Sequence, residues 1–296
     1  MRLMSVLLII IVNYNVENLF HPAHDSLKDD IEWTANGERH WSYTRYYKKV
    51  DNIARVLTNI GEWDGVDVVG LQEVENSLCV NRLCYTIRRN EYDFVHYESP
   101  DRRGIDVALI YKKSRVDTLS TRAIKVESQK SKDESLITRD ILYVCAQIDK
   151  QDTIHFFVCH LPSQRGGKAE SEWKRDAAKQ VLERAVDSVY ATNQDAKIIV
   201  MGDMNSGDLI LKGLQVMGYG LRGEGTHKYQ GRWIFLDHFY VSPALDSVSQ
   251  AEVYDAEWIQ EPDEKYLGLK PKRTYNGFHY QNGYSDHLPI ILRCLK

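Results

Sequence analysis

The sequence has few of the features that divide a chain into separate parts. Only 7 of its 296 residues are proline, and no stretch rich in proline, glycine or serine interrupts it. Stretches of that kind mark linkers between domains. Because strand-like segments also recur along the whole length, we expect residues 1–296 to form a single domain.

The chain also lacks a strong excess of charge of one sign. Its net charge is −4, with 43% hydrophobic and 27% charged residues. This composition is typical of a globular protein with a sizeable core, and it argues against disorder. It excludes nucleic-acid binding through bulk positive charge, but it leaves room for a local basic groove.

No apolar run is long enough to cross a membrane. The longest, at 3–12, follows Met1-Arg2 and looks like a short signal-peptide core, yet no small-residue cleavage site precedes Asn15. The alternative is a first buried strand. We therefore expect no stable membrane insertion and favour a cytoplasmic location, with export as the alternative.

Cysteine is scarce and gives no metal signature. The 5 cysteines are odd in number, and no His or Cys cluster accompanies Cys79 and Cys84. These two thiols are expected to pair only if the protein is exported. Cys145 and Cys159 lie in apolar runs, where a buried thiol is the usual interpretation.

Apolar runs rich in β-branched residues predict many strands. They cover 5–15, 66–71, 92–97, 105–111, 141–148, 153–159, 197–201, 234–241 and 288–294. Two segments instead have helical spacing, one through Tyr46, Val50 and Ile53, the other through Ala178 and Leu182. Many buried strands with few helices favour two stacked sheets with helices outside.

Polar side chains follow several of these strands directly. Asn15, Glu73, His160 and Asp203 each come after an apolar run. Taken singly, such a residue is usually a turn former or a helix cap. Together they predict a cleft along one edge of the sandwich, with its side chains held by rigid strands.

Six short motifs, in a fixed order along the chain, contain these polar residues and indicate a common site. They lie at 14–19, 71–75, 160–163, 202–206, 236–239 and 285–290, and the most specific are Gly-Asp-Met-Asn and Ser-Asp-His-Leu-Pro-Ile. The series resembles the endonuclease/exonuclease/phosphatase superfamily, in particular bacterial members described as endonucleases. The resemblance implies a four-layered α/β sandwich of two packed mixed sheets flanked by helices.

Hydrolysis of a phosphodiester requires charge to be neutralised on the phosphate and on the leaving oxygen. A hard cation with oxygen ligands does both, so we expect Mg²⁺, with Mn²⁺ as a possible substitute and one ion rather than two. Glu73 is the principal candidate metal ligand, and Asn15 is expected beside it in the metal site, where its amide would contact ligand water or phosphate. The resemblance implies that Asp286 completes the metal shell.

The resemblance also implies catalytic roles for five residues. Asp203 orients and deprotonates the attacking water, and the Asn205 amide assists it. His287 donates to the phosphate, with Asp237 as the carboxylate that orients it. His160 contacts phosphate and is a candidate proton donor to the leaving group; its alternative role is that of a core histidine. His238 is expected to be structural because it points away from Asp237 along the strand.

Three arginines are candidate substrate-binding residues. Arg103, Arg139 and Arg165 are suited to phosphate because a guanidinium engages two oxygens at once, although solvated surface charge is an equally good explanation. Asp106 stands within an apolar run. Because an unpaired buried carboxylate is costly, Arg103 or Arg139 is expected to pair with it.

The substrate is expected to be nucleic acid or another phosphodiester, cleaved by a monomeric nuclease. The segments 254–284 and 226–233, rich in aromatic and charged residues, are predicted to form the cleft walls, where they would either stack on bases or pack as loops. The alternatives are a phosphatase or phospholipid phosphodiesterase of the inositol phosphate or sphingomyelin type, and a binding module that has lost catalysis.

Overall fold

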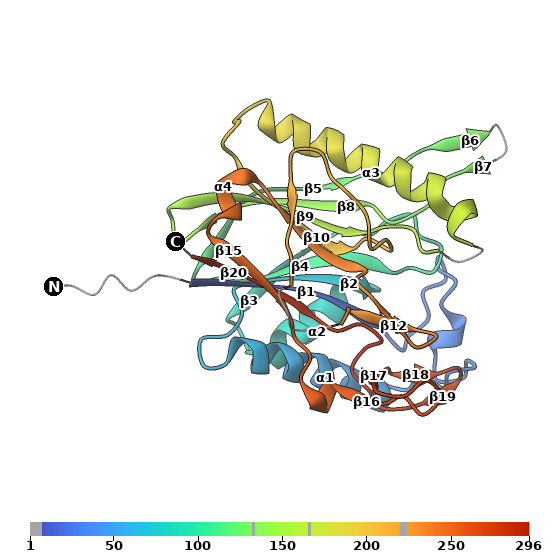
Figure 1. The fold of residues 1–296 in the computed structure, drawn as a ribbon. Coiled ribbons are helices and arrows are strands. Elements are labelled where there is room, and N and C mark those ends of the chain that lie inside the picture. The colour runs from blue at the N-terminus through green and yellow to red at the C-terminus, as the bar shows by residue number, and fades with distance from the viewer. Residues whose placement is uncertain (1–7, 132–133, 165–166, 220–223, 296) are drawn as a thin grey trace.

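The protein is built on two six-stranded mixed sheets that pack face to face (Figure 1). The computed structural model describes residues 8–131, 134–164, 167–219 and 224–295. In the first sheet the strand order is β15 (Ser249–Val253), β20 (Ile290–Leu295), β1 (Leu8–Leu19), β2 (Val68–Val74), β4 (Asp106–Lys112) and β3 (Tyr92–His96). In the second it is β11 (Gln215–Val216), β14 (Asp237–Val241), β10 (Lys197–Asp203), β9 (Asp152–His160), β8 (Ile141–Ile148) and β5 (Val116–Ile124).

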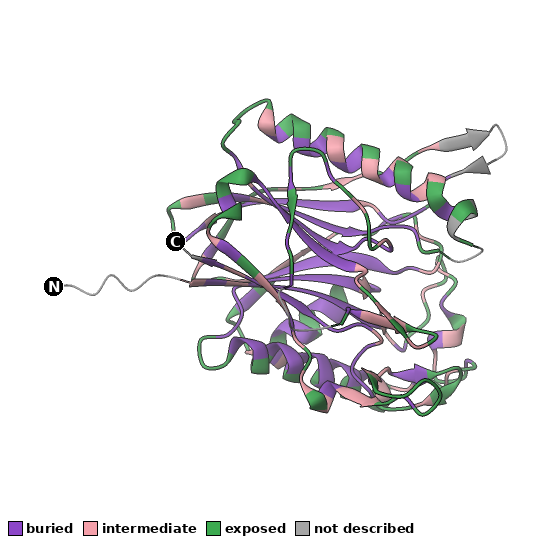
Figure 2. Cartoon of the chain, in the orientation of Figure 1, coloured by how far each residue is buried: buried purple, intermediate pink, exposed green. Residues whose placement is uncertain are grey.

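Helices cover the outer face of each sheet, which gives the expected four layers. In Figure 1, α1 (Tyr43–Gly61) and α2 (Ser77–Ile87) lie against the first sheet and α3 (Lys168–Tyr190) lies against the second. In Figure 2 the strands are mostly buried, whereas each helix exposes its outer side. The apolar spacing that predicted α1 and α3 corresponds to their buried faces, and both predictions are confirmed.

The central strands of the second sheet are apolar on both sides because both of their faces are covered. In β9, Phe156 and Val158 face the first sheet, whereas Phe157 and Cys159 pack with α3. Successive side chains of a strand point to opposite faces, so a strand covered on both faces must be apolar throughout. Close approach of the sheets is visible at Gly70, where an added Cβ would lie 2.8 Å from Met201 Sδ.

Shorter elements complete the chain. They are η1 (Ile31–Trp33), β6 (Gln129–Ser131), β7 (Glu134–Ser135), β12 (His227–Tyr229), β13 (Arg232–Ile234), α4 (Pro243–Asp246), η2 (Glu257–Ile259), β16 (Gln260–Pro262), β17 (Leu269–Pro271), β18 (Tyr275–Asn276) and β19 (His279–Tyr280). The hairpins β12–β13, β16–β17 and β18–β19 fall in the two segments predicted to form cleft walls.

Several elements gave no clear signal in the sequence, among them the sheet strands β5, β11 and β15 and the helix α2. β5 is an edge strand with mostly exposed side chains, so it lacks an apolar run. α2 is short, and its buried face includes Cys79 and Cys84. No disulfide joins these two residues, because all five cysteines of the protein are free thiols.

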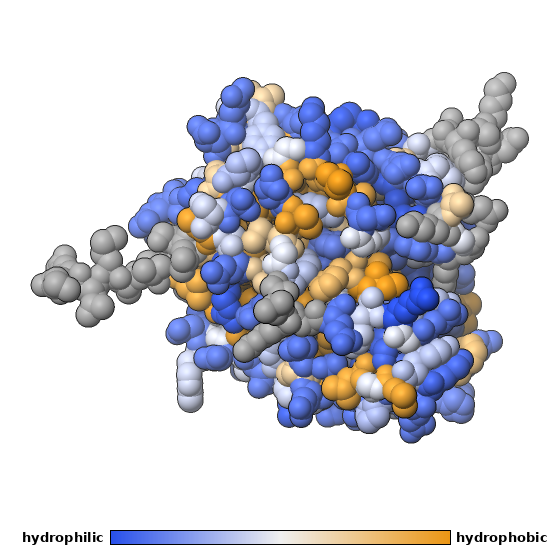
Figure 3. All heavy atoms as spheres, viewed as in Figure 1, coloured by the Kyte–Doolittle hydropathy of each residue, from blue (hydrophilic) through white to orange (hydrophobic). Residues whose placement is uncertain are grey.

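The apolar run near the N-terminus forms a central strand. From Leu8 onward, β1 pairs in parallel with β2 and antiparallel with β20. Residues 5–7 of the predicted strand lie outside the described part of the chain. On the face seen in Figure 3, hydrophilic side chains predominate at the margins and hydrophobic groups gather in the middle. Among the helices that the structure describes, none is long and apolar enough to span a bilayer.

Candidate active site

Three of the predicted catalytic residues lie side by side across the second sheet. Asp203 ends β10 and is paired in register with His160 of β9 on one side and with Asp237 of β14 on the other. Residues opposite each other on neighbouring strands point to the same face. The register therefore places these three side chains in one row, although they come from distant parts of the sequence.

His287, in the loop before β20, brings the first sheet to this row. Its Nδ1 lies 2.7 Å from Asp237 Oδ2, and its Nε2 lies 3.8 Å from Asp203 Oδ2. Burial by itself would lower the pKa of His287, but Asp237, Asp203 and Asp286 raise that pKa well above its ordinary value. His287 is therefore an imidazolium at neutral pH, and the predicted pairing with Asp237 is present.

Asp203 is held between the two sheets. Asn15 of β1 donates from Nδ2 to Asp203 Oδ2 at 3.1 Å, and the Asn205 backbone N–H donates to Oδ1 at 2.8 Å. Burial raises the pKa of the Asp203 carboxyl to about 7, and Asp237 and Glu73 add to this rise against the lowering effect of His287. A carboxylate with a pKa near neutrality suits a general base.

Asn205 holds the surrounding loop in place. Its Nδ2 donates to the Leu161 carbonyl at 3.0 Å, and its backbone adopts a φ of 48° in the left-handed region. Asparagine tolerates this conformation better than most residues. In this structure the amide therefore fixes the turn after β10, and its predicted contact with phosphate stays a prediction.

His160 lies against the carboxylates of Glu73 and Asp203, and its surroundings favour the neutral imidazole. Its Nε2 is 3.6 Å from Asp203 Oδ2 and 3.9 Å from Glu73 Oε1. Burial lowers the pKa of His160 well below its ordinary value, and Arg139, Arg103 and His287 lower it further. A neutral imidazole donates only one N–H, which suits a hydrogen bond to phosphate better than the protonation of a leaving group.

Glu73 lies at a β-bulge at the end of β2. The β2–β4 register shifts between Gln72 and Val74, and Glu73 has a φ of 66°. A left-handed glutamate costs on the order of 1–3 kcal/mol, and such residues cluster at functional sites. Its Oε2 accepts from the Asn18 backbone N–H at 2.9 Å.

A buried network of charges beside Glu73 contains residues that sequence analysis missed. Glu17 Oε1 lies 3.6 Å from Arg273 Nε, and its Oε2 lies 3.8 Å from Lys49 Nζ. Arg273 also bonds Asp286 at 2.5 Å. Burial, followed by the charge of Asp286, raises the pKa of Glu17 to about 7. The only signal in the sequence was the position of Glu17 two residues after Asn15.

Of the predicted metal ligands, Glu73 and Asp286 offer carboxylate oxygens and Asn15 offers an amide oxygen. Glu17, which was not predicted, adds a further carboxylate. Oxygen ligands of this kind suit a hard cation that keeps several waters. Among the described residues, the one set of three His, Cys, Asp or Glu ligand atoms within 4.8 Å of one another is His96, Glu98 and Asp106, on the outer strands β3 and β4 and the loop between them. The donor chemistry therefore fits a hard divalent cation with Glu73 as a ligand, whereas Asp286 is paired with Arg273.

Of the three candidate arginines, one is buried behind His160. Arg139 Nε donates to the His160 carbonyl at 3.1 Å, and its Nη1 bonds Asp101 at 2.9 Å. The expectation that Arg103 or Arg139 pairs with Asp106 is wrong. Asp106 instead accepts from the Ser99 backbone N–H at 3.1 Å and from the Ser99 hydroxyl, because the loop between β3 and β4 folds over it. Arg165 lies outside the described residues.

Comparison with known proteins identifies the family to which the chain belongs. The model of the endonuclease/exonuclease/phosphatase family matches residues 10–216 and 212–296. The chain belongs to this family. Members of the family are phosphoester hydrolases that generally depend on a divalent metal. No curated protein sequence matches the chain.

Solved structures of the family share the fold at low sequence identity. TDP2 from Caenorhabditis elegans has a TM-score of 0.63 and 15% identity, covering 99% of this chain and 77% of that one. A family protein from Bacteroides thetaiotaomicron has a TM-score of 0.61 and 16% identity, with 98% of each chain covered. A mannosyl-6-phosphatase from the same species has a TM-score of 0.57 and 14% identity, covering 96% and 98%.

The predicted wall segments reach the candidate site from two sides. In the first, the His227 ring lies 4.8 Å from the His287 ring, and the Leu288 backbone N–H donates to the Thr226 carbonyl at 2.7 Å. In the second, the Thr274 backbone N–H donates to Glu17 Oε2 at 2.6 Å. His238 bonds the Ser206 carbonyl at 3.1 Å, which agrees with its predicted structural role.

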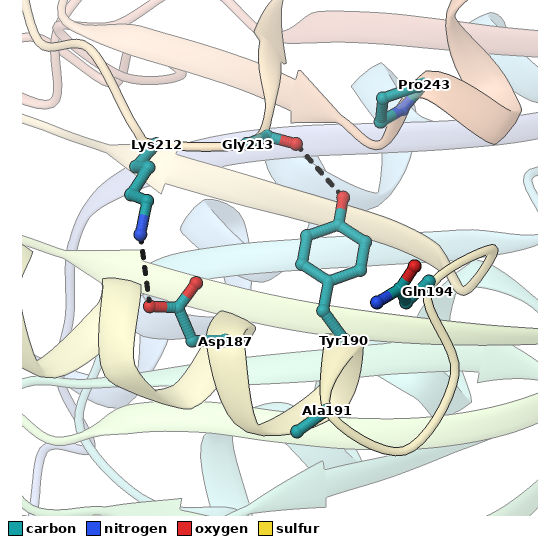
Figure 4. Close-up of a pocket in the computed structure, with 7 residues that line it drawn as sticks. All are labelled: Asp187, Tyr190, Ala191, Gln194, Lys212, Gly213 and Pro243. Carbon is teal, nitrogen blue, oxygen red and sulfur yellow. Dashed lines mark hydrogen bonds and ion pairs between the residues drawn. The ribbon is translucent and has the colours of Figure 1, made fainter.

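A separate hollow lies at the opposite end of the second sheet (Figure 4). It has a volume of about 500 Å³ between the end of α3 and Pro243, and Tyr190 donates across it to the Gly213 carbonyl at 3.0 Å. Pro243 comes just after Val241, which pairs with Ile199 at one end of the β10–β14 pair. Asp203 and Asp237 pair with each other at the opposite end. The hollow is therefore remote from the site.

Proposed function

We propose that the protein is a nuclease, which hydrolyses phosphodiester bonds in nucleic acid and depends on Mg²⁺ or Mn²⁺. The observation that carries this proposal is the buried Asp203, with a pKa of about 7, beside the paired imidazolium of His287. A proton acceptor and a positive hydrogen-bond donor stand together at the ends of rigid strands. In-line attack by water on phosphorus requires both.

Each group has a distinct task in this proposal. Asp203 takes the proton from the attacking water, and Asn15 and the Asn205 backbone hold the carboxylate in position. His287 donates a charged hydrogen bond to a non-bridging phosphate oxygen, and Asp237 keeps that ring oriented and protonated. When bound, the divalent cation supplies charge neutralisation on the phosphate and on the departing oxygen.

The wall segment 254–284, which contacts Glu17, favours nucleic acid over other phosphoesters. Arg39 lies over the rings of Trp33, at 4.4 Å, and Phe278, at 5.4 Å, and the Phe278 side chain is 58% exposed. An exposed ring next to a cation is suited to base stacking. Tyr275 and Tyr284 are instead buried, so they pack within the wall.

A substrate panel tests the proposal. Plasmid, single-stranded DNA, RNA, bis(p-nitrophenyl) phosphate, sugar and inositol phosphates, and sphingomyelin vesicles are each incubated with Mg²⁺ or with a chelator. We expect Mg²⁺-dependent cleavage of nucleic acid that is lost in Asp203→Asn and kept in Asp195→Asn, an exposed control. Phosphate release from monoesters alone would favour a phosphatase, and sphingomyelin cleavage alone a lipid phosphodiesterase. Inactivity on every substrate would support a binding module.

A further inference from the structure

A basic hollow adjoins the catalytic row on the side of His160. It has a volume of about 390 Å³, within the usual range for small-molecule sites. Three loop segments, 101–103, 136–139 and 162–163, line it together with Ser171 and Lys174 of α3. Its cationic groups are Arg102, Arg103, Arg139 and Lys174, and Asp101 is the only acidic residue in the lining.

The wall of this hollow is shared with the active site. Arg139, whose side chain is 4% exposed, donates to the His160 carbonyl at 3.1 Å and to the Leu161 carbonyl at 3.3 Å. The same Leu161 carbonyl accepts from Asn205 Nδ2 at 3.0 Å. Pro162 then continues the chain from Leu161 into the lining. A group bound in the hollow is thus separated from Asn205 by the backbone of a single loop.

Among the described residues, the positive charges of the hollow are not balanced by negative ones. Asp101 Oδ2 pairs with Arg139 Nη1 at 2.9 Å, and its Oδ1 lies 3.8 Å from Arg103 Nε, so the one carboxylate is engaged by two guanidinium groups. In the part of the chain that the structure describes, Arg102 and Lys174 have no ion-pair partner. The excess of positive charge in a partly enclosed space favours an anion.

We propose that this hollow binds a second phosphate of the substrate, next to the phosphate that is cleaved. The inference rests on the proposed function and specifies its substrate, a polynucleotide with phosphates on consecutive nucleotides. Arg102, Arg103 and Lys174 hold the second phosphate, and Arg139 fixes the loop that joins the two positions. A substrate with a single phosphate leaves the hollow empty and binds more weakly.

Binding to a catalytically silent protein tests the subsite without relying on turnover. Asp203→Asn is titrated with thymidine 5′-phosphate, thymidine 3′-phosphate and thymidine 3′,5′-bisphosphate by calorimetry. We expect the bisphosphate to bind about tenfold more tightly than either monophosphate, which corresponds to about 1.4 kcal/mol. Adding Arg102→Gln and Lys174→Gln should reduce this preference to about twofold or less. Adding Lys179→Gln instead, on the same helix but outside the lining, should preserve it.

Turnover gives an independent measure of the same preference. One pair of substrates is thymidine 5′-(p-nitrophenyl phosphate) with and without a 3′-phosphate, and the other is thymidine 3′-(p-nitrophenyl phosphate) with and without a 5′-phosphate. In wild-type protein the second phosphate should lower KM, and in the double variant the KM values should converge. Equal affinities for mono- and bisphosphate in the parent protein would overturn the subsite while leaving the nuclease proposal intact. A clear binding preference in a protein that cleaves no nucleic acid would sink the proposed function alone.

Discussion

Asn15 donates a hydrogen bond of 3.1 Å to the carboxylate of Asp203, across 188 positions of sequence and from one sheet to the other. The contact links the carboxyl-terminal half of β1 to the carboxyl end of β10, and both strands belong to the parallel pair of their sheet. The candidate active site is thus formed where the matching ends of two sheets meet.

Replacing Asn15 should therefore change the titration of Asp203. Asn15→Ala removes a hydrogen bond that favours the charged carboxylate, so the pKa of Asp203 rises. We expect about a tenfold loss of kcat/KM at pH 7 and an acid limb of the pH–rate profile shifted to higher pH. The control Asn13→Ala, on the same strand and bonded to Gln72, should leave this limb in place. An unshifted limb in the Asn15 variant would show that the contact is only structural.

The pH dependence of the wild-type enzyme follows from the same carboxyl group. Burial raises the pKa of Asp203 to about 7, so below pH 7 most molecules carry a protonated group that cannot accept a proton from water. The value of kcat/KM should rise with pH up to about 7 and then level off, because His287 stays charged beyond neutrality. A flat profile between pH 5 and 8 would contradict the role of Asp203 as the base.

Removing the partner of His287 should lower activity and bring in an alkaline limb. In Asp237→Asn, burial of His287 is opposed by less negative charge, so the pKa of this histidine falls. We expect kcat to decrease by about 100-fold or more at neutral pH, with further loss as pH rises. Histidine NMR titration measures the shift directly. A normal rate combined with a lowered pKa would exclude charge on His287 from the mechanism.

Metal dependence should be most sensitive to Glu73. Glu73→Gln removes a charged oxygen ligand, and we expect the Mg²⁺ concentration for half-maximal activity to rise by about tenfold or more. Mn²⁺ binding followed by electron paramagnetic resonance should weaken in parallel. Glu75→Gln is a matched control, because burial raises the pKa of Glu75 to about 8 and the residue is largely uncharged at neutral pH. Equal effects in both variants would refute Glu73 as the ligand.

Lys49 should matter for stability more than any other lysine of α1. Its buried Nζ bonds the Thr274 hydroxyl and the Tyr284 carbonyl, at 2.5 and 2.6 Å, and faces Glu17. Lys49→Met leaves Glu17 without one of its two cations, which should lower the free energy of unfolding by about 3 kcal/mol. Urea denaturation measures this change. The exposed Lys48→Met should shift it by less than about 0.5 kcal/mol.

Much of the sandwich is determined by sequence alone, because its central strands are buried on both faces and must be apolar throughout. The runs ending near Asn15, Glu73, His160 and Asp203 all became strands. His160 and Asp203 end their strands and Glu73 is next to the last residue of β2, whereas β1 continues past Asn15 to Leu19. Helical spacing likewise located α1 and α3. These signals are local, because a few helical turns or a short apolar run is enough to show the pattern.

Only the tertiary structure decided how charges are shared among these residues. Arg273 reaches Glu17 and Asp286, and Arg139 turns to Asp101 and the His160 carbonyl. Such pairs join segments that are far apart in the sequence, so no local pattern predicts them. Whether a buried carboxylate meets a cation, a backbone N–H or another carboxylate depends on strand register and loop path. The sequence therefore indicates most of the residues that meet at the candidate site, but not Glu17 and Lys49. The packing of the two sheets decides the protonation states of all of them.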